Sequence, residues 1–317
     1  MALSQMQVFN EYIMPATIET LGQMIQKFNA ESGGAIRLTT DGFDGDFYQE
    51  SFFAAIHSAQ RRVDRYAAQG AAAPTDLTQL KHQGVKVAGG FGPIRFEPSQ
   101  LTWLQKPTAE GIEVASRNFA EALLADQLNT SIAALVAAIS NQAALVNDVS
   151  LTSGINQRAL NGAHAKFGDA SSRIIANVMT GQALHTLIDG ALANAEQLFL
   201  AGNVRVVDIL GKRFVVTDAP ALSAGGNDLV LGLVEGAATV WDGGDVVSNI
   251  ETTNGQTRIE TTMQVDYSFG LSLKGYAWDD VNGGKSPSDV ALSTGTNWDL
   301  VMTSVKDTAG VLAIGAQ

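Results

Sequence analysis

The longest regular pattern in the sequence is helical, and it begins after Pro107-Thr108 and continues to about Val146. At about 1.5 Å per residue, some 35 to 39 residues would span roughly 50 to 60 Å, more than a compact domain of this size needs. The apolar spacings keep no strict heptad, so a coiled coil is the weaker alternative. The pattern predicts an elongated molecule built along one helix, whose apolar stripe contains Ile112, Ala115, Phe119, Leu123, Leu128, Ile132, Leu135, Ile139 and Ala143.

A second long pattern has a period of two and runs from Arg258 to Lys274. Strict alternation predicts a β-strand with one face toward the core. Because strands usually have about five or six residues, we expect this one to be bent, bulged at Gly270 or Gly275, or part of a long sheet shared with other segments. Its apolar positions are Ile259, Met263, Val265, Tyr267, Phe269, Leu271 and Leu273.

Residues 35–103 have the pattern of extended chain flanking a helix. Residues 52–68 are compatible with a helix, and Gly70 to Pro74 interrupts it. The return leg contains Val85-Lys86-Val87 and then the glycine-rich stretch from Gly89 to Pro93. This composition favours a protruding ribbon over a packed core strand.

The remaining segments complete an α+β chain. Residues 1–34 predict an arm with a short amphipathic helix, and residues 104–150 contain the long helix. Residues 151–250 predict a compact α/β lobe, and residues 251–317 return to long strands. Within the lobe we expect helices at 155–165 and 181–200, strands at 174–179, 204–207, 213–217 and 229–233, and a tight turn at Leu210-Gly211-Lys212.

Charged residues make up 16% of the chain, against about 25% in an average soluble domain. A near-neutral surface suggests that much of it meets other protein, although a large core or an Ala- and Gly-rich sequence also lowers the charged fraction. The net charge is −12, and the basic residues cluster only at Arg61, Arg62 and Arg65. We therefore expect no tight nucleic-acid binding. The triplet predicts a solvated helix face or a basic patch that meets acidic surface on a neighbouring copy.

Motifs for catalysis, cofactors or metals are missing from the sequence. There is no cysteine, no phosphate-binding loop and no nucleophile elbow. Pro93-Ile94-Arg95 follows Gly90-Phe91-Gly92 where a dinucleotide-binding loop needs a third glycine at the start of a helix. His185 and Asp189 lie one helical turn apart, but Leu184 and Leu187 beside them indicate a helix packed on a core. No enzyme activity, cofactor or metal is predicted.

Two further features do not indicate a binding site. The turn from Asp279 to Gly283 resembles the start of a calcium loop, but the closing position, twelve residues from Asp280, is Ala291 and not Glu. The four tryptophans are scattered and suggest core or interface anchors.

The start of the chain lacks a signal-peptide pattern, and no run of about 18 apolar residues stands out. We expect a protein made in a cytoplasm, without a membrane partner.

Several short stretches, in this order, resemble the major capsid proteins of tailed bacteriophages. They are Ala163 to Asp169, Ile175 to Thr180, the helix with Leu184 and Leu187, Val206 to Pro220, Glu235 to Ala238, and Thr296 to Trp298. The resemblance covers most of the chain and implies the Johnson fold, with an N-arm, an extended loop, a peripheral domain with a long spine helix, and an axial domain.

The resemblance also implies function. Such a protein assembles into hexamers and pentamers of an icosahedral shell around double-stranded DNA, without sequence-specific binding. It works in the virion after assembly in the host bacterial cytoplasm, with portal and decoration or tail-connector proteins as partners. Little room before Ala35 suggests a separate scaffolding protein, and no covalent cross-linking is predicted. The candidate inter-subunit contacts are Phe47, Phe52, Phe53, Arg61, Arg62, Arg65, Lys81 and Lys86.

Three alternatives stay open. An encapsulin-type shell would enclose cargo enzymes and no DNA. An α/β enzyme without recognisable motifs would be a stable monomer with a deep polar pocket. A non-viral surface-lattice protein would need export, for which the sequence offers no signal peptide.

Overall fold

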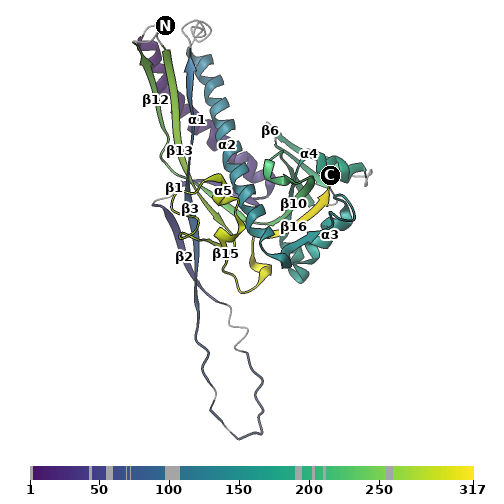
Figure 1. Ribbon diagram of the computed structural model, residues 1–317. Coiled ribbons are helices and arrows are strands. Elements are labelled where there is room, and N and C mark those ends of the chain that lie inside the picture. Colours follow the sequence, from purple (N-terminus) through teal and green to yellow (C-terminus); the bar gives the residue numbers. More distant parts are fainter. Residues whose placement is uncertain are drawn as a thin grey trace.

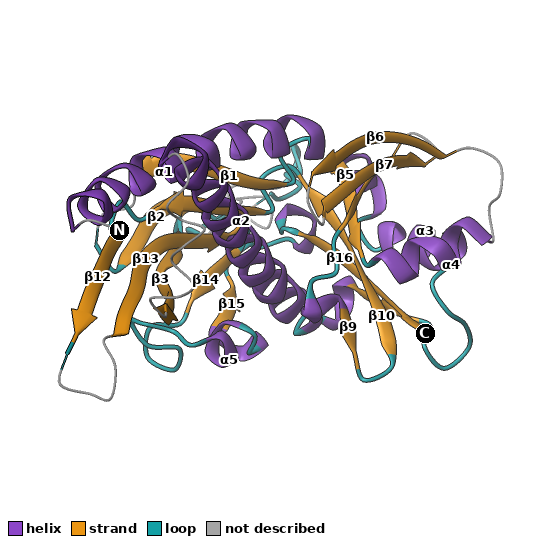
Figure 2. Ribbon diagram, turned by 90° about the horizontal axis from the view of Figure 1, so that it is seen from above, coloured by secondary structure: helices purple, strands orange, loops and turns teal. Residues whose placement is uncertain are grey.

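The computed structural model describes residues 3–42, 45–54, 60–68, 70–71, 73–96, 108–189, 195–201, 204–209, 212–254 and 260–317. Two β-sheets lie on either side of a long helix, α2 (Thr108–Ser140), and the molecule is elongated (Figures 1 and 2). A long loop projects from one end, between β2 (Phe47–Phe53) and β3 (Gln79–Phe96). The predicted α+β class is confirmed.

The first sheet has six strands in the order β1-β11-β13-β3-β2, and β12 pairs with β13. Strands β1 and β11 are parallel, whereas the other pairs are antiparallel. Every apolar position of β13 from Met263 to Leu273 is buried, as predicted, and Gln264 and Asp266 between them are exposed. From Tyr267 onward both faces are buried, including Ser268 and Ser272, so the prediction of a single buried face holds only for the first part of the strand. The strands not yet given bounds are β1 (Ile36–Gly42), β11 (Ala238–Asp242), β12 (Val247–Thr253) and β13 (Glu260–Leu273).

The long strand β13 belongs to a shared sheet, as one of the alternatives predicted, but its bulge is elsewhere. The register with β3 shifts between Met263 and Val265, which pair with Ile94 and Phe91. The extra residue is therefore on β3, at Gly92-Pro93, and not at Gly270 or Gly275. Gly92 has φ +103°, a conformation that side-chain-bearing residues rarely adopt.

The second sheet has eight strands in the order β4-β16-β10-β5-β8-β7-β6, with β9 paired to β10. Strand β5 falls at the predicted residues, and antiparallel β7 and β8 confirm the predicted hairpin, whose turn residues Leu210 and Gly211 lie outside the described residues. Separately, β14 (Tyr276–Trp278) and β15 (Trp298–Leu300) form a two-stranded pair. The eight strands are β4 (Val146–Asp148), β5 (Ile174–Met179), β6 (Ala195–Ala201), β7 (Val204–Ile209), β8 (Lys212–Val216), β9 (Ser223–Ala224), β10 (Asn227–Val234) and β16 (Gly310–Ala316).

The helices correct three predictions. Helix α1 (Leu3–Ser32) has 30 residues and is not short, because Leu21, Ile25 and Phe28 belong to the same core as α2. The predicted helix at 52–68 is wrong, since Phe52 and Phe53 are in β2 and residues 60–68 have no regular structure. Helix α4 (Gly181–Asp189) ends early, and the segment predicted to continue it contains β6. The other helices are α3 (Gln157–Ala165) and α5 (Asp289–Leu292).

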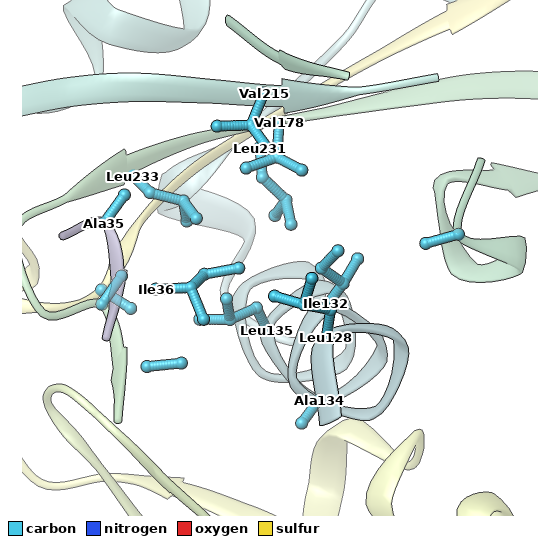
Figure 3. Packing of buried hydrophobic residues seen from close by; sticks show 14 of the residues in the cluster. Ala35, Ile36, Leu128, Ile132, Ala134, Leu135, Val178, Val215, Leu231 and Leu233 are labelled. Atoms are coloured by element: carbon cyan, nitrogen blue, oxygen red, sulfur yellow. The ribbon is translucent and has the colours of Figure 1, made fainter. Parts of the chain in front are cut away.

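Helix α2 begins within one residue of the predicted start and packs between the two sheets, but it ends at Ser140 and not near Val146. Residues Ala143–Leu145 form a 3-10 turn and Val146 begins β4, so Ala143 is not part of the apolar stripe. In Figure 3, Ile132 and Leu135 of α2 lie beside Ile36 of β1, and Leu231 and Leu233 of β10 belong to the same cluster. The segment Ser116–Ser140 has a mean hydropathy of 1.5, and 61% of its most apolar stretch is buried inside the protein. By length and composition this segment could cross a membrane, which corrects the expectation that no such apolar run exists, but burial between the sheets accounts for its hydropathy.

Candidate assembly surface

The ribbon formed by β2 and β3 is anchored at its base and free at its tip. Strand β3 pairs with β13 from Val85 to Phe96 and with β2 from Gln79 to Val85. Val85 and Val87 are buried, so this part of the return leg is a core strand, contrary to the prediction. The outer part has two strands, and two strands by themselves are marginally stable in water.

Before β3 the chain forms an extended loop, which we define by its described residues 60–68, 70–71 and 73–78. Every described residue between 60 and 78 is exposed, and Figure 1 shows this loop projecting away from the rest of the molecule. Large apolar side chains are among them: Tyr66 is 95% exposed, and Val63 and Leu77 are more than half exposed. Ordering a residue costs about 1–2 kcal/mol of backbone entropy, and the described residues from 60 to 78 bury no side chain in their own subunit to offset that cost.

The structure brings the aromatic candidates onto one strand but gives them different environments. Phe47, at the base of β2, packs against the core, and Phe52 is half-buried. Phe53, at the outer end, is 64% exposed. Of the three, Phe53 is the side chain most available to another subunit.

The basic candidates also differ in where they lie and in whether they form an ion pair. Arg61, Arg62 and Arg65 are exposed on the extended loop and not on a helix face, and within the described residues they form no ion pair. Lys81 is exposed on β3, opposite Ser51. Lys86 instead pairs with Asp245 of its own chain, and this contact lowers the pKa of the Asp245 carboxyl. Among the described residues, the three arginines and Lys81 are therefore the candidate cations that form no ion pair within the subunit.

The features that suggested chemistry have structural roles. The Asp279 carboxyl accepts a hydrogen bond from the Asn282 side-chain amide, which is the main cause of its lowered pKa, and the backbone N–H groups of Val281 and Asn282 also donate to it and close a turn. Leu184 and Leu187 of α4 are buried as predicted, and His185 points to the exposed side. Within the part of the chain that the structure describes, no three His, Asp or Glu side chains come together as metal ligands would.

Two tryptophans are core anchors. Trp278 and Trp298 pack edge to face with their rings 4.9 Å apart, and both are buried. Trp298 Nε1 donates to the Leu292 carbonyl at 3.0 Å. Trp103 lies outside the described residues.

Sequence reasoning missed one half-buried carboxyl and one groove. Tyr267 of β13 donates a 2.6 Å hydrogen bond to Asp126 of α2, and burial raises the pKa of the Asp126 carboxyl. The groove lies between α1 and α2, and Gln127 and Ile18 are among the residues that line it. Both features join segments more than 100 residues apart, so no local pattern marks them.

Comparison with known proteins agrees with this architecture. The family model described as "Major capsid protein 13-like" matches residues 5–312. A solved structure from Microbacterium phage Oxtober96 has a TM-score of 0.50 at 14% identity, covering 90% of each chain. One from Mycobacterium phage Bobi has a TM-score of 0.51 at 10% identity, covering 88% of each chain.

An encapsulin is also among the similar structures. The holo-SrpI encapsulin complex from Synechococcus elongatus PCC 7942 has a TM-score of 0.46 at 9% identity, covering 88% of this chain and 84% of that one. No curated protein sequence matches the chain. The family match spans nearly all of the chain, and the similar phage structures share its fold. The chain therefore belongs to the Gp13-like family of major capsid proteins, and it is a capsid shell protein with the Johnson fold.

Proposed function

We propose that this chain forms hexamers and pentamers that tile an icosahedral phage head around double-stranded DNA. The observation that carries the proposal is the extended loop, whose described residues from 60 to 78 are all exposed. Such a loop is useful only if a neighbouring subunit covers it, and a closed shell gives every copy a neighbour. An acidic chain with a net charge of −12 would also enclose DNA without trapping it.

The parts of the chain divide by assembly role in this proposal. Residues 1–34 are the N-arm, 35–103 the extended loop with its flanking strands, 104–150 the part with the spine helix and 151–250 the axial domain. Strand β4, after the spine helix, already pairs in the axial sheet, and β11 near the end of 151–250 pairs in the six-stranded sheet, so the chain crosses between the two sheets inside these bounds. Residues 251–317 return to the peripheral domain through β13, and the last strand, β16, joins the axial sheet. Assembly takes place in the bacterial cytoplasm with a separate scaffolding protein, and portal and decoration or tail-connector proteins complete the particle.

Electron microscopy of the expressed chain, alone and with a candidate scaffold, tests the proposal. We expect closed shells with capsomers of six and five subunits. An encapsulin-type shell would contain cargo protein, whereas phage heads from infected cells would show a dominant DNA absorbance. Monomers under every condition would contradict assembly.

The basic triplet supplies a sharper test. Reversing Arg61, Arg62 and Arg65 to Glu should reduce shell yield about tenfold, because mispaired charges at an interface cost about 1.4 kcal/mol or more in total. The fold should survive, since the three side chains make no ion pair in their own subunit among the described residues.

The matched control reverses Arg117, Arg158 and Lys285, which are also exposed and change the net charge by the same amount. Sedimentation measures the shell fraction, and circular dichroism confirms folding. Equal loss of assembly in both variants would mean that net charge, and not the loop, is responsible.

A further inference from the structure

A small groove opens between the two longest helices. Ile18, Leu21 and Ile25 of α1 form one wall, Leu123 of α2 lies opposite, and the cavity volume is about 40 Å³. Ligand pockets for small molecules are about 300–1,000 Å³. The groove is therefore too small for a metabolite and has the size for the tip of one side chain from another protein surface.

The groove also presents an unused hydrogen-bond acceptor. Gln127 of α2 lines it and is 5% exposed, yet its Oε1 has no hydrogen-bond partner among the described residues. A buried carbonyl oxygen without a partner costs free energy that a donor would recover. Among the lining residues, in the described part of the chain, Asp242 is the one that carries a charge. The groove thus suits an apolar tip with a hydrogen-bond donor, next to a cation.

Tyr66 of the extended loop has this chemistry. Its ring is apolar, its hydroxyl donates, and Arg65 precedes it in the chain. The backbone N–H of Tyr66 donates to Asp64 Oδ1 at 2.9 Å, a turn that holds the side chain outward, 95% exposed. Figure 1 shows the loop projecting away from α1 and α2, so a subunit's own Tyr66 does not reach its groove.

We propose that the groove between α1 and α2 receives Tyr66 from the extended loop of a second copy, with the phenol hydroxyl donating to Gln127 Oε1 and Arg65 facing Asp242. The proposal rests on shell assembly, and it assigns the surface that covers the loop. Aromatic side chains that fill a pocket beside a charged pair are typical anchors of protein interfaces.

Filling the groove tests this assignment. A Cβ added at Gly22 of α1 meets nothing within 4 Å, and Leu favours a helix over Gly, so Gly22→Leu should fold. We expect about a tenfold loss of shell yield. The control is Gln23→Leu, the same new side chain at the next, exposed position of α1. Assembly of Gly22→Leu at the wild-type level would overturn the assignment.

An engineered disulfide gives a direct readout, because the chain has no cysteine. Shells of Tyr66→Cys with Ile18→Cys should give a ladder of linked subunits on non-reducing gels, since both positions are exposed and would meet across the interface. Tyr66→Cys with Leu151→Cys, also exposed, should give none.

The outcomes separate the two proposals. Wild-type shells with no ladder from the groove pair, or with Ile18→Cys linked to a scaffold cysteine instead, would refute the groove assignment and leave shell assembly standing. A chain that never assembles would refute both. In shells that form, Tyr66→Phe and Gln127→Leu should each lower the denaturant midpoint of disassembly, and the double variant should lower it no further.

Discussion

At the scale of single residues, the contact between Asp126 and Tyr267 shows how one half-buried carboxyl affects the stability of the subunit. Burial raises the pKa of the Asp126 carboxyl above 3.8, and Asp289 raises it further, while the hydrogen bond from Tyr267 works in the other direction. The folded state therefore holds a proton at pH values where the unfolded chain has lost it. As pH rises from 3.8 through the raised pKa, the folded state loses stability relative to the unfolded chain.

We predict that Asp126→Asn increases the free energy of unfolding at pH 7, because it removes the desolvated charge and keeps an acceptor for Tyr267. Urea unfolding of the unassembled subunit between pH 4 and 8 measures this. Asp279→Asn is the control of opposite sign, since hydrogen bonds from Asn282 and Val281 lower the pKa of that carboxyl. An Asp126→Asn subunit no more stable than the wild type at pH 7 would contradict the prediction.

At the scale of elements, α2 is the part that holds both sheets together. Leu135 is fully buried and lies with Ile36 of the six-stranded sheet, and Leu231 of the eight-stranded sheet belongs to the same cluster (Figure 3). One side chain on this helix should therefore affect the two sheets at once.

Leu135→Ala should cost about 2–5 kcal/mol of unfolding free energy, the usual range for a buried leucine. Leu151→Ala, at a residue that is 99% exposed, should stay within about 0.5 kcal/mol of the wild type. In Leu135→Ala, the rate of amide hydrogen exchange should rise in both β10 of the eight-stranded sheet and β11 of the six-stranded sheet. Faster exchange in one sheet alone would show that the sheets unfold independently.

At the scale of the whole molecule, the elongated shape and the uncovered loop belong to a subunit built for assembly. Residues 60–78 make no strand or helix where they are described, so their amides should exchange rapidly in the free subunit. In assembled shells we expect exchange there to slow by about tenfold or more, as a neighbour buries the loop. The strand β5, buried in both states, is the internal reference. An unchanged rate in shells would mean that the loop stays exposed after assembly.

Much of this protein follows from local sequence patterns. The start of α2, the bounds of β5 and the buried face of β13 were predictable, because periodicity and turn residues report which face of an element is covered. The resemblance carried by the order of short motifs also indicated the capsid fold. The bounds and buried faces of these elements depend mainly on neighbours along the chain.

Tertiary structure decided what depends on distant neighbours. Residues 52–53 lie in a strand because β3 pairs with them, and α1 extends to 30 residues while its apolar face shares a core with α2. The bulge lies on β3 because Gly92 adopts a positive φ there, which lets β3 accommodate the extra residue while β13 continues as a regular strand. The pair of Asp126 and Tyr267 and the groove at Gln127 arise where segments more than 100 residues apart meet. The packing energy between such distant segments outweighs local propensity, and it cannot be predicted from any single stretch of the sequence.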